Sequence, residues 1–437
     1  MIKNKVFKNA SWIIGCKLVQ AVLNIFISSL TARFLGTANF GVINYAASIV
    51  AFFVPIMQLG INSVVVQEYV NNEEEEGKII GTSVSLCLSS ALLSICGVFL
   101  FASIANAGER ETIIVCVLYS LLLISQAFEM IQYWFQAKYL SKYTSIIMLV
   151  AYVITTAYKI FLLITKKSVY WFALSHAIDY ILIAIGLFVA YKFLGKQKLS
   201  FSFSIAKRLI SKGKYYIISF MMVTIFAHTD KIMIKLMIDN EATGMYSAAV
   251  ACAGMTSFVF SAIIDSMRPL ILKSKNESDE QFKDNLKILY SIVIYVALAQ
   301  CLCMTLFAKL IIRILYGTAY FGAINILQIV VWYTTFSYIG AVRDVWILAE
   351  KKQKYLWIIN LSGALTNVVL NAILIPLIGI NGAALASLVT QIFTNIILGF
   401  IIKPIRANNR ILLQALDPRI IIKGVQALLG KKGKANE

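Results

Sequence analysis

Apolar runs of about 20 residues recur along the 437-residue sequence. Each run is long enough to cross a hydrocarbon layer of about 30 Å as an α-helix. Only 14% of the residues are charged and the mean hydropathy is +0.79, which is too apolar for the surface of a soluble protein of this length. The sequence therefore predicts an all-α, multi-pass membrane protein.

Twelve membrane-spanning helices fit the pattern. We expect them at 10–33, 40–64, 79–104, 112–135, 144–165, 170–193, 214–237, 244–267, 287–308, 322–347, 356–377 and 381–402. The longest connection falls after the sixth helix, so the predicted organisation has four parts. These are an N-terminal lobe (1–195), a cytoplasmic linker (196–213), a C-terminal lobe (214–403) and a basic cytoplasmic tail (404–437). Two halves of six helices are typical of transporters built from repeats.

Basic residues orient these helices. With the N-terminus inside, 29 of the 40 lysines and arginines fall in inner segments and only six in outer loops. Inner loops of membrane proteins are enriched in Lys and Arg, so both termini are expected in the cytoplasm. The net charge of +19 is then mainly a topology signal. Membrane lipids are expected contacts, whereas no segment is large enough to form a nucleic-acid-binding face.

Polar residues recur at helical spacing within several runs. The first helix carries such a stripe, and others include Gln58, Glu129, His228 with Lys231, and three asparagines of the eleventh helix. The first stripe consists of Lys17, Gln20, Asn24, Ser28 and Thr31, and the asparagines are Asn360, Asn367 and Asn371. Polar groups are costly in hydrocarbon, so such stripes either line a shared hydrated cavity or join neighbouring helices by hydrogen bonds. The second explanation is simpler for single Ser, Thr and Asn residues.

Full charges within the spans are stronger functional candidates. Lys17, Lys231 and Arg343 lie about 12–13 Å from a helix end at 1.5 Å per residue, too deep to reach water easily. Lys159 and Lys235 lie nearer the outer ends and are expected to extend to the interface.

The acids within the spans have two possible roles, a structural ion pair or the binding of a proton or Na⁺. The candidates for ion coupling are Glu129, Asp179, Asp230 and Asp265. Arg343 and Asp344 are neighbours on a helix and point about 100° apart, so each is expected to pair with a charge on another helix.

Deep cations beside amide-rich walls suit an anionic, hydroxyl-rich cargo. Phosphate prefers guanidinium and ammonium groups, while sugars prefer amides, hydroxyls and aromatic faces. The residues expected to contact the cargo are Lys17, Lys231, Arg343, Asn24, His228 and Gln58.

Three segments resemble bacterial polysaccharide flippases. They are ARFLGTANFGVINYA (32–46), DKIMIKLMIDNEATGMYSAA (230–249) and IPLIGINGAALAS (375–387). With twelve helices in matching order, the chain is similar to Wzx-type O-antigen or capsule flippases of the multidrug/oligosaccharidyl-lipid/polysaccharide (MOP) exporter superfamily. The resemblance implies two six-helix lobes around a central cationic cavity, as in MATE transporters, with alternating access from the two sides.

The resemblance also implies a cargo and a location. The cargo would be an oligosaccharide repeat unit on undecaprenyl pyrophosphate, flipped to the outer leaflet of the bacterial inner membrane with a polysaccharide polymerase downstream. A proton or sodium gradient is the candidate energy source.

Two alternatives stay open. A MATE-type multidrug or cation antiporter shares the fold, but a cavity edged by lysine and arginine would repel cationic cargo. A polysaccharide polymerase or ligase is also polytopic, but the outer loops here are short and carry no catalytic set. We expect no catalytic residues, no metal and no cofactor.

Overall fold

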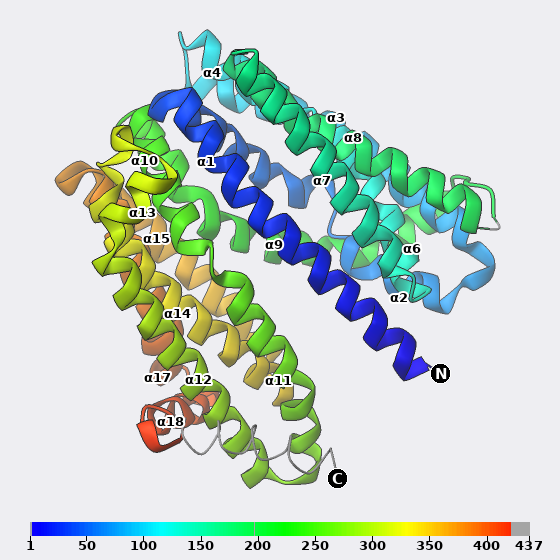
Figure 1. Ribbon diagram of the computed structural model, residues 1–437. Helices are drawn as coiled ribbons and strands as arrows, with labels where there is room; N and C mark the ends of the chain where they lie inside the picture. Colours follow the sequence, from blue (N-terminus) through cyan, green and yellow to red (C-terminus); the bar gives the residue numbers. More distant parts are fainter. Residues whose placement is uncertain (1, 196, 421–437) are drawn as a thin grey trace. The chain divides into compact units, whose positions relative to one another are not determined.

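In the computed structural model, residues 2–195 and 197–420 are described, and they contain helices and turns but no strand (Figure 1). Within this part of the chain, eleven segments are long and apolar enough to cross a membrane. The chain divides into two compact units, Met1–Ser247 and Ala248–Glu437. The end of the predicted basic tail, 421–437, lies outside the described residues.

The first unit is a bundle in which α1 packs against α3, α4, α7 and α9, and α8 packs against α4, α5 and α7. Its helices are α1 (Ile2–Met57), α2 (Asn62–Asn71), α3 (Glu76–Ala105), α4 (Arg110–Ser120), α5 (Leu122–Gln126), α6 (Met130–Ala137), α7 (Ser141–Ile164), α8 (Val169–Leu194) and α9 (Phe203–Met237), with 3-10 turns η1 (Glu73–Glu75) and η2 (Ala127–Glu129).

The second unit is built around α14, which packs against α11, α12 and α16, while α15 packs against α16. Helix α10 (Asn240–Gly254) begins in the first unit and ends in the second. The remaining helices are α11 (Ser257–Glu277), α12 (Asp279–Leu306), α13 (Ala308–Leu315), α14 (Ala323–Ala349), α15 (Leu356–Ile378), α16 (Ile380–Ile392), α17 (Leu398–Ile401) and α18 (Arg406–Gln414), and a π-helical turn η5 (Phe393–Ile397) joins α16 to α17.

The eleven segments accommodate the twelve predicted spans because the first segment, Gly15–Asn71, contains two of them. A straight helix of those 57 residues would be about 85 Å long, far more than the hydrocarbon thickness of about 30 Å. Helix α1 is interrupted at Gly36, where φ is 74° and ψ is 175°. Glycine adopts this left-handed backbone readily because it lacks a Cβ. The break separates the first predicted span from the second.

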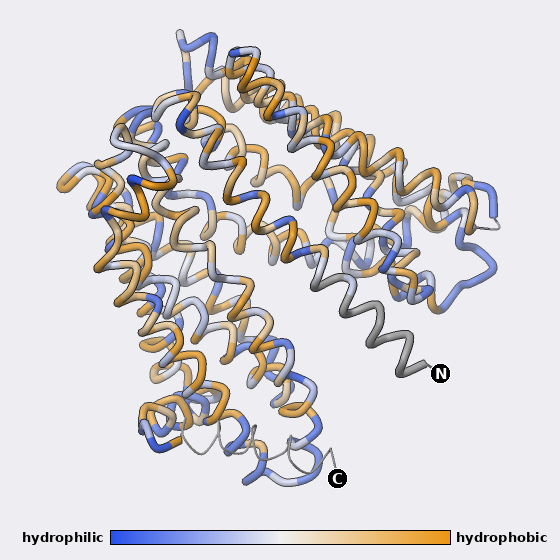
Figure 2. The backbone as a smooth tube through the Cα atoms, in the orientation of Figure 1, coloured by the Kyte–Doolittle hydropathy of each residue, from blue (hydrophilic) through white to orange (hydrophobic). Residues whose placement is uncertain are grey.

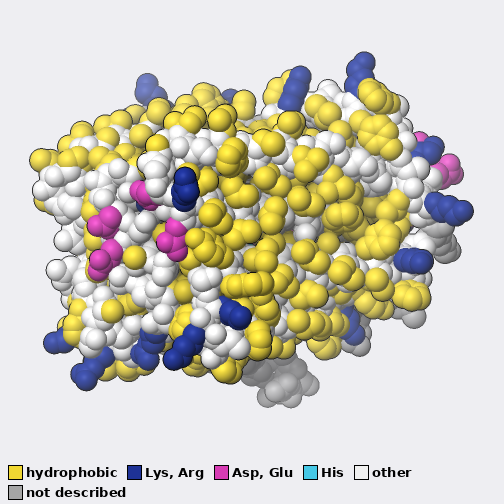
Figure 3. All heavy atoms as spheres, turned by 90° about the horizontal axis from the view of Figure 1, so that it is seen from above, with side chains coloured by type: hydrophobic (Ala, Val, Ile, Leu, Met, Phe, Trp, Pro, Cys, Tyr) yellow, Lys and Arg dark blue, Asp and Glu magenta, His cyan; other side chains and the backbone are white. Residues whose placement is uncertain are grey.

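The eleven candidate membrane segments of the described chain each contain a long apolar stretch. Figure 2 shows hydrophobic residues along the helices and hydrophilic residues concentrated at the connections between them. On the face drawn in Figure 3, hydrophobic side chains form a broad surface and most Lys and Arg side chains lie towards its edge. This pattern fits helices whose sides face hydrocarbon and whose ends face water. The chain is a multi-pass membrane protein.

The predicted linker is fastened to the first unit. Its backbone runs against α3, where Ser200 N donates to Gly77 O (3.3 Å) and Ser202 N donates to Thr82 Oγ1 (2.9 Å). The Gln197 side chain accepts from Gly77 N at 2.8 Å and donates to Glu73 O at 3.0 Å. The two backbones can approach this closely because Gly77 and Gly81 of α3, which face the linker, have no Cβ atom.

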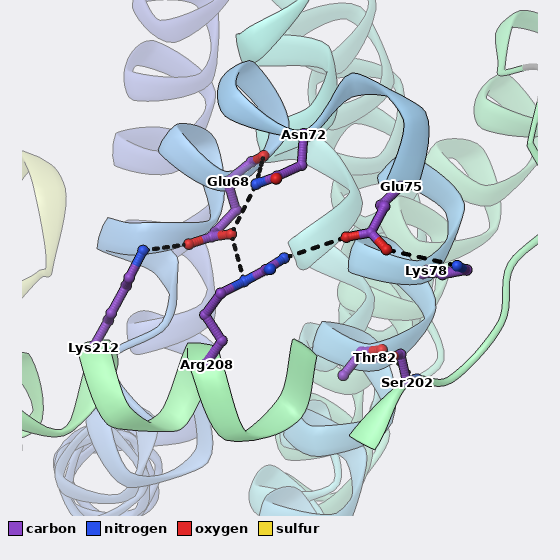
Figure 4. A network of polar contacts seen from close by, with 8 residues as sticks. All are labelled: Glu68, Asn72, Glu75, Lys78, Thr82, Ser202, Arg208 and Lys212. Carbon is purple, nitrogen blue, oxygen red and sulfur yellow. Dashed lines mark hydrogen bonds and ion pairs between the residues drawn. The ribbon is translucent and has the colours of Figure 1, made fainter. Parts of the chain in front are cut away.

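An ion-pair network holds the start of α9 beside the linker (Figure 4). The Glu68 side chain of α2 is only 1% exposed. Its carboxylate lies 2.9 Å from Arg208 Nε and 2.7 Å from Lys212 Nζ, both on the first turns of α9. Helix α9 also shares the core of the first unit through Ile205 and Leu209. Contacts therefore group α9 with the first unit, and the division at Ser247 falls well beyond the predicted linker.

Replacing Gly81 by Ala tests the contact between the linker and α3. A Cβ at Gly81 would lie 2.4 Å from Ser200 O, a backbone atom that cannot rotate away. We expect Gly81→Ala to lower the free energy of unfolding by about 1–3 kcal/mol, measured by thermal unfolding of the detergent-purified protein. Gly15→Ala is the matched control, because no atom lies within 4 Å of its Cβ. The control should leave stability unchanged or raise it by up to about 1 kcal/mol. Equal effects of the two substitutions would contradict the described contact.

Candidate functional site

A polar cavity of about 440 Å³ lies within the first unit; we call it the N-terminal cavity. Helix α1 contributes three residues of its polar stripe, η2 contributes one acid, and α7 and α8 supply the opposite wall. The polar and aromatic lining residues are Lys17, Gln20, Asn24, Glu129, Tyr152 and Asp179, with Tyr180 beside Asp179. The structure thus brings together four of the predicted site residues from three different elements.

The stripe on α1 explains how the cavity forms. Lys17, Gln20 and Asn24 are three and four residues apart, so they share one face of the helix. Apolar residues of α1, such as Val22 and Phe26, are exposed on other faces. An exposed apolar side chain is favourable in lipid, whereas the polar face is stabilised by turning towards a hydrated cavity. The predicted alignment of this stripe is confirmed by its position in the cavity wall.

Hydrogen bonds orient the far wall. Tyr152 Oη donates to Asn24 Oδ1 at 3.2 Å, which joins α7 to α1. One turn further along α7, Thr155 Oγ1 donates to Asp179 Oδ1 at 3.0 Å, which joins α7 to α8. The amide and the carboxylate are therefore held in place before any ligand arrives, as a binding site requires.

A second, smaller cavity of about 130 Å³ continues from Asn24. Its polar wall includes Ser28 and Thr31 from the same α1 stripe, and Lys159 and His176 from α7 and α8. The His176 ring packs on Tyr119, with ring centroids 4.6 Å apart. Lys159 was expected to extend to the interface, but it lines this cavity instead. A protein interior that supplies polar neighbours removes the need for the side chain to reach water.

Lys235 also differs from the expectation that it reaches the interface. It is only 6% exposed, and its Nζ donates to both carboxylate oxygens of Glu109, at 2.7 and 2.8 Å. Glu109 lies in the turn before α4 and brings its carboxylate to Lys235, while the Tyr45 ring lies 5.5 Å from Nζ. The hydrogen bonds from Lys235 hold the pKa of the Glu109 carboxyl below its usual value. The Glu109 carboxylate thus accepts the hydrogen bonds that Lys235 would otherwise donate to water at the interface.

The remaining predicted residues of the first unit lie outside these two cavities. Gln58 accepts from Asn62 Nδ2 at 3.0 Å, at the turn between α1 and α2. Asp230 is buried and accepts a hydrogen bond from the Tyr246 hydroxyl of α10. His228 and Lys231, on the same helix as Asp230, are partly buried.

In the second unit, Arg343 is buried and its guanidinium bonds to the π-helical turn. Its Nη1 donates to Thr394 O at 3.0 Å and to Asn395 Oδ1 at 2.9 Å. Its Nη2 lies 2.9 Å from Asp344 Oδ1, so the prediction that these neighbours pair elsewhere was wrong. A long guanidinium can bend back towards the next residue, whereas the 100° rule describes only the Cα–Cβ directions.

Two other predicted features of the second unit have local roles. Asp265 is largely exposed and pairs with Arg268, one turn along α11, at 3.2 Å. Asn367 and Asn371 of α15 are fully buried; Asn371 Nδ2 donates to Asn367 Oδ1 at 3.1 Å, and Asn367 Nδ2 donates to Ser387 Oγ of α16 at 3.3 Å. For these asparagines the simpler explanation, hydrogen bonding between helices, is confirmed.

One wall of the site includes two residues that were not predicted from the sequence, Tyr152 and Thr155. Tyr152, Thr155 and Lys159 are three and four residues apart on α7, and they contact or line the two cavities in turn. This spacing is the same signal that identified the α1 stripe. It escaped notice because tyrosine and threonine occur commonly in apolar helices and carry no charge.

Comparison with known proteins assigns the chain to a family. Residues 6–275 match the profile of a family described as "Polysaccharide biosynthesis protein". The chain belongs to this family. No curated protein matches it in sequence.

Solved structures show which fold the chain has. An inward-facing multidrug resistance MATE family transporter of the MOP superfamily has a TM-score of 0.72 at 12% identity, covering 90% of this chain and 96% of that one. The lipid II flippase MurJ in an inward closed conformation has a TM-score of 0.69 at 16% identity, covering 92% and 90%. A MOP superfamily transporter from Pyrococcus furiosus scores 0.54 at 12% identity, covering 92% and 95%. At these identities the likeness establishes the fold that these three transporters share, as predicted.

Glu109→Gln should destabilise the protein in a pH-dependent way. At neutral pH the substitution leaves the buried Lys235 ammonium without its anion, and we expect a loss of about 1–2 kcal/mol, reduced because Glu109 is half exposed. The folded-state pKa of Glu109 is depressed, so its stabilisation is complete above the unfolded value of about 4.3 and is lost as the pH falls through the lower folded value.

Thermal unfolding between pH 3 and 8 measures this effect. The difference between the native protein and the variant should be constant at neutral pH and should shrink as the native protein's Glu109 becomes protonated. Glu111→Gln, an exposed acid two residues away, is the control and should show no such difference. A gap between native protein and Glu109→Gln that stays constant down to the lowest pH would contradict the ion pair.

Proposed function

We propose that this protein moves lipid-linked oligosaccharide repeat units from the inner to the outer leaflet of the bacterial cytoplasmic membrane, for O-antigen or capsule synthesis, without catalysing a reaction on them. The family match and the MOP fold support a membrane flippase or transporter in polysaccharide biosynthesis. The observation that carries the proposal is the N-terminal cavity, which places an ammonium, two amides, two carboxylates and two tyrosines within a membrane-spanning unit.

The chemistry of that cavity suits the head of such a cargo. A saccharide can cross hydrocarbon only if its hydroxyls exchange water for other hydrogen-bond partners. Amide and carboxylate side chains supply donors and acceptors for hydroxyls, and tyrosine rings supply faces on which a sugar ring can pack. Lys17 supplies a point charge for phosphate. The lipid tail needs no cavity, because it remains in the bilayer.

Undecaprenyl pyrophosphate is the proposed carrier, with Lys17, Lys231 and Arg343 as its cationic contacts and Asn24, His228 and Gln58 as polar contacts. The hydrogen bonds of Arg343 to Thr394, Asn395 and Asp344 give it a structural task as well. Lys17 and Lys231 are therefore the cleaner test of cargo binding. Both termini are proposed to lie in the cytoplasm, and a polysaccharide polymerase is the proposed consumer of the flipped units.

Transport is proposed to be coupled to a proton or sodium gradient through buried carboxylates. Of the four candidates, Asp265 is exposed beside Arg268 and Asp230 accepts from Tyr246. Glu129 and Asp179 share the N-terminal cavity and are the best placed to exchange an ion with water. A carboxylate that accepts a hydrogen bond from a sugar hydroxyl can also bind a proton or Na⁺ when no cargo occupies the cavity.

A MATE-type antiporter of cationic compounds is the second candidate. The observation that favours it is the excess of carboxylates over ammonium groups among the described residues of the N-terminal cavity, where Glu129 and Asp179 accompany Lys17. The family match favours the first candidate, since it places the chain among polysaccharide biosynthesis proteins.

Deleting the gene in its host separates these functions. We expect surface polysaccharide to disappear and single lipid-linked repeat units to collect on the cytoplasmic leaflet, measured by their accessibility to an added glycosidase or lectin in oriented vesicles. Units that cross and wait unpolymerised on the outer side would indicate a polymerase instead. Normal surface polysaccharide with altered tolerance to cationic drugs would favour the antiporter.

Purified protein in proteoliposomes tests the proposed cations and the coupling. Lys17→Ala and Lys231→Ala should each reduce flipping of a lipid-linked saccharide about tenfold or more, with Lys→Arg milder because the charge is kept. Arg343→Ala should lose activity and stability together, because Thr394 O and Asn395 lose a donor.

The same vesicles measure the energy source. An imposed proton or sodium gradient should accelerate flipping in the native protein, and Asp179→Asn should weaken that acceleration. Full activity of both lysine variants at normal protein levels would refute the cation assignment. Flipping that ignores both gradients would remove the coupling from the proposal.

A further inference from the structure

We propose that the N-terminal cavity is the subsite for the first sugar of the cargo, the one joined to the pyrophosphate, and that it selects an uncharged sugar over a uronic acid. This inference rests on the proposed function and specifies which part of the cargo lies in the cavity. It is carried by the order of the lining residues, by their hydrogen bonds and by their charges.

The residues are ordered along the helices. Lys17 and Asn24 are seven residues apart on α1, so their Cα atoms are separated by about 10 Å along the helix axis. Asn24 is joined to Tyr152, and Asp179 is joined to Thr155 one turn further along α7. The ammonium therefore lies at one end of the cavity, and the amide and carboxylate lie towards the other. In a pyrophosphate-linked saccharide, the phosphate and the first sugar are covalent neighbours in the same order.

The far end has the groups that bind sugar hydroxyls. Asp179 can accept hydrogen bonds, Asn24 can both donate and accept, and Tyr152 and Tyr180 supply rings, while Glu129 lines the same cavity as a further acceptor. The bonds from Tyr152 and Thr155 fix the amide and the carboxylate, so little side-chain entropy is lost on binding. A volume of about 440 Å³ lies within the range of roughly 300–1,000 Å³ typical of small-molecule sites. The adjoining cavity of about 130 Å³ is below that range.

The charges supply the selectivity. Two carboxylates and one ammonium line the N-terminal cavity, and the ammonium is at the end assigned to phosphate. Lys159 lies one turn beyond Thr155, in the smaller cavity beside His176. A uronic acid would bring its own carboxylate against Asp179 and Glu129, and like charges at close range oppose binding strongly. An uncharged hexose or N-acetylhexosamine would instead donate hydrogen bonds from its hydroxyl groups to them.

The test compares three probes on the purified full-length protein: polyprenyl-pyrophosphoryl-N-acetylglucosamine, polyprenyl-pyrophosphoryl-galacturonic acid, and polyprenyl pyrophosphate alone. Apparent Kd values come from the concentration dependence of the thermal shift. The native protein should bind the N-acetylglucosamine probe at least about tenfold more tightly than the galacturonic acid probe. In the Glu129→Gln/Asp179→Asn double variant, this gap should fall below about threefold through tighter binding of the uronic acid, with polyprenyl pyrophosphate unchanged.

Two further variants keep the test informative if the double variant does not fold. Tyr152→Phe keeps the ring but loses the hydroxyl that orients Asn24, so it should weaken the N-acetylglucosamine probe about three- to tenfold and leave polyprenyl pyrophosphate unaffected. Glu74→Gln, an exposed acid outside the cavity, is the matched control and should leave all three Kd values unchanged.

Several outcomes would overturn the inference. Equal affinity of the native protein for the two sugars would do so, as would variants that weaken all three probes alike. If Na⁺ alone stabilises the protein, Asp179→Asn abolishes that effect and the sugar makes no difference, the cavity is a cation site instead. A native protein that binds and flips the lipid-linked probes regardless of sugar would refute only this inference. One that binds none of them would refute the proposed function as well.

Discussion

Hydrocarbon offers no hydrogen bonds, and this constraint determines where each polar side chain of the protein lies. Backbone N–H and C=O groups form hydrogen bonds with each other within the helices, so only the polar side chains need partners from elsewhere. On α1, Phe26 faces outward while Asn24, two residues earlier, lines a cavity and accepts from Tyr152. On α15, Asn367 and Asn371 turn inward and bond to each other and to α16. The same rule therefore yields a hydrated cavity in one unit and a sealed interhelical contact in the other.

Helix α9 belongs to the first unit because it is fastened there at both ends. Near its start, Glu68 holds Arg208 and Lys212, and Gly60 and Gly213 allow the backbones to meet. Near its end, Lys235 is held by both carboxylate oxygens of Glu109. These contacts combine buried charge with partners of opposite sign, an arrangement that destabilises strongly when one member is lost. A helix held in this way carries its polar residues, His228 and Lys231, as fixed parts of the first unit.

Periodicity was enough to predict the spans, the break near Gly36 as a division between two of them, and the α1 stripe, because each depends on a local pattern. It was not enough to place Lys235, whose partner Glu109 is 126 residues away, between the third and fourth predicted spans. The contact between Arg343 and Asp344 depends on side-chain torsions, which spacing does not constrain. The stripe on α7 was within reach of periodicity, but a hydroxyl such as that of Tyr152 gives a weaker signal than a charge.

The charge of the whole chain is a poor guide to the charge of its cavities. The excess of basic residues lies mostly in segments that the sequence predicts on the cytoplasmic side, following the positive-inside rule. Within the candidate spans, Arg343 donates hydrogen bonds to Thr394 and Asn395, and the Lys235 ammonium pairs with the Glu109 carboxylate. Among the described residues that line the N-terminal cavity, Lys17 is the one cation, opposite two carboxylates. Under the proposed function, a cavity with one cation at its end and acids along its wall would hold phosphate at one position and an uncharged sugar at the next.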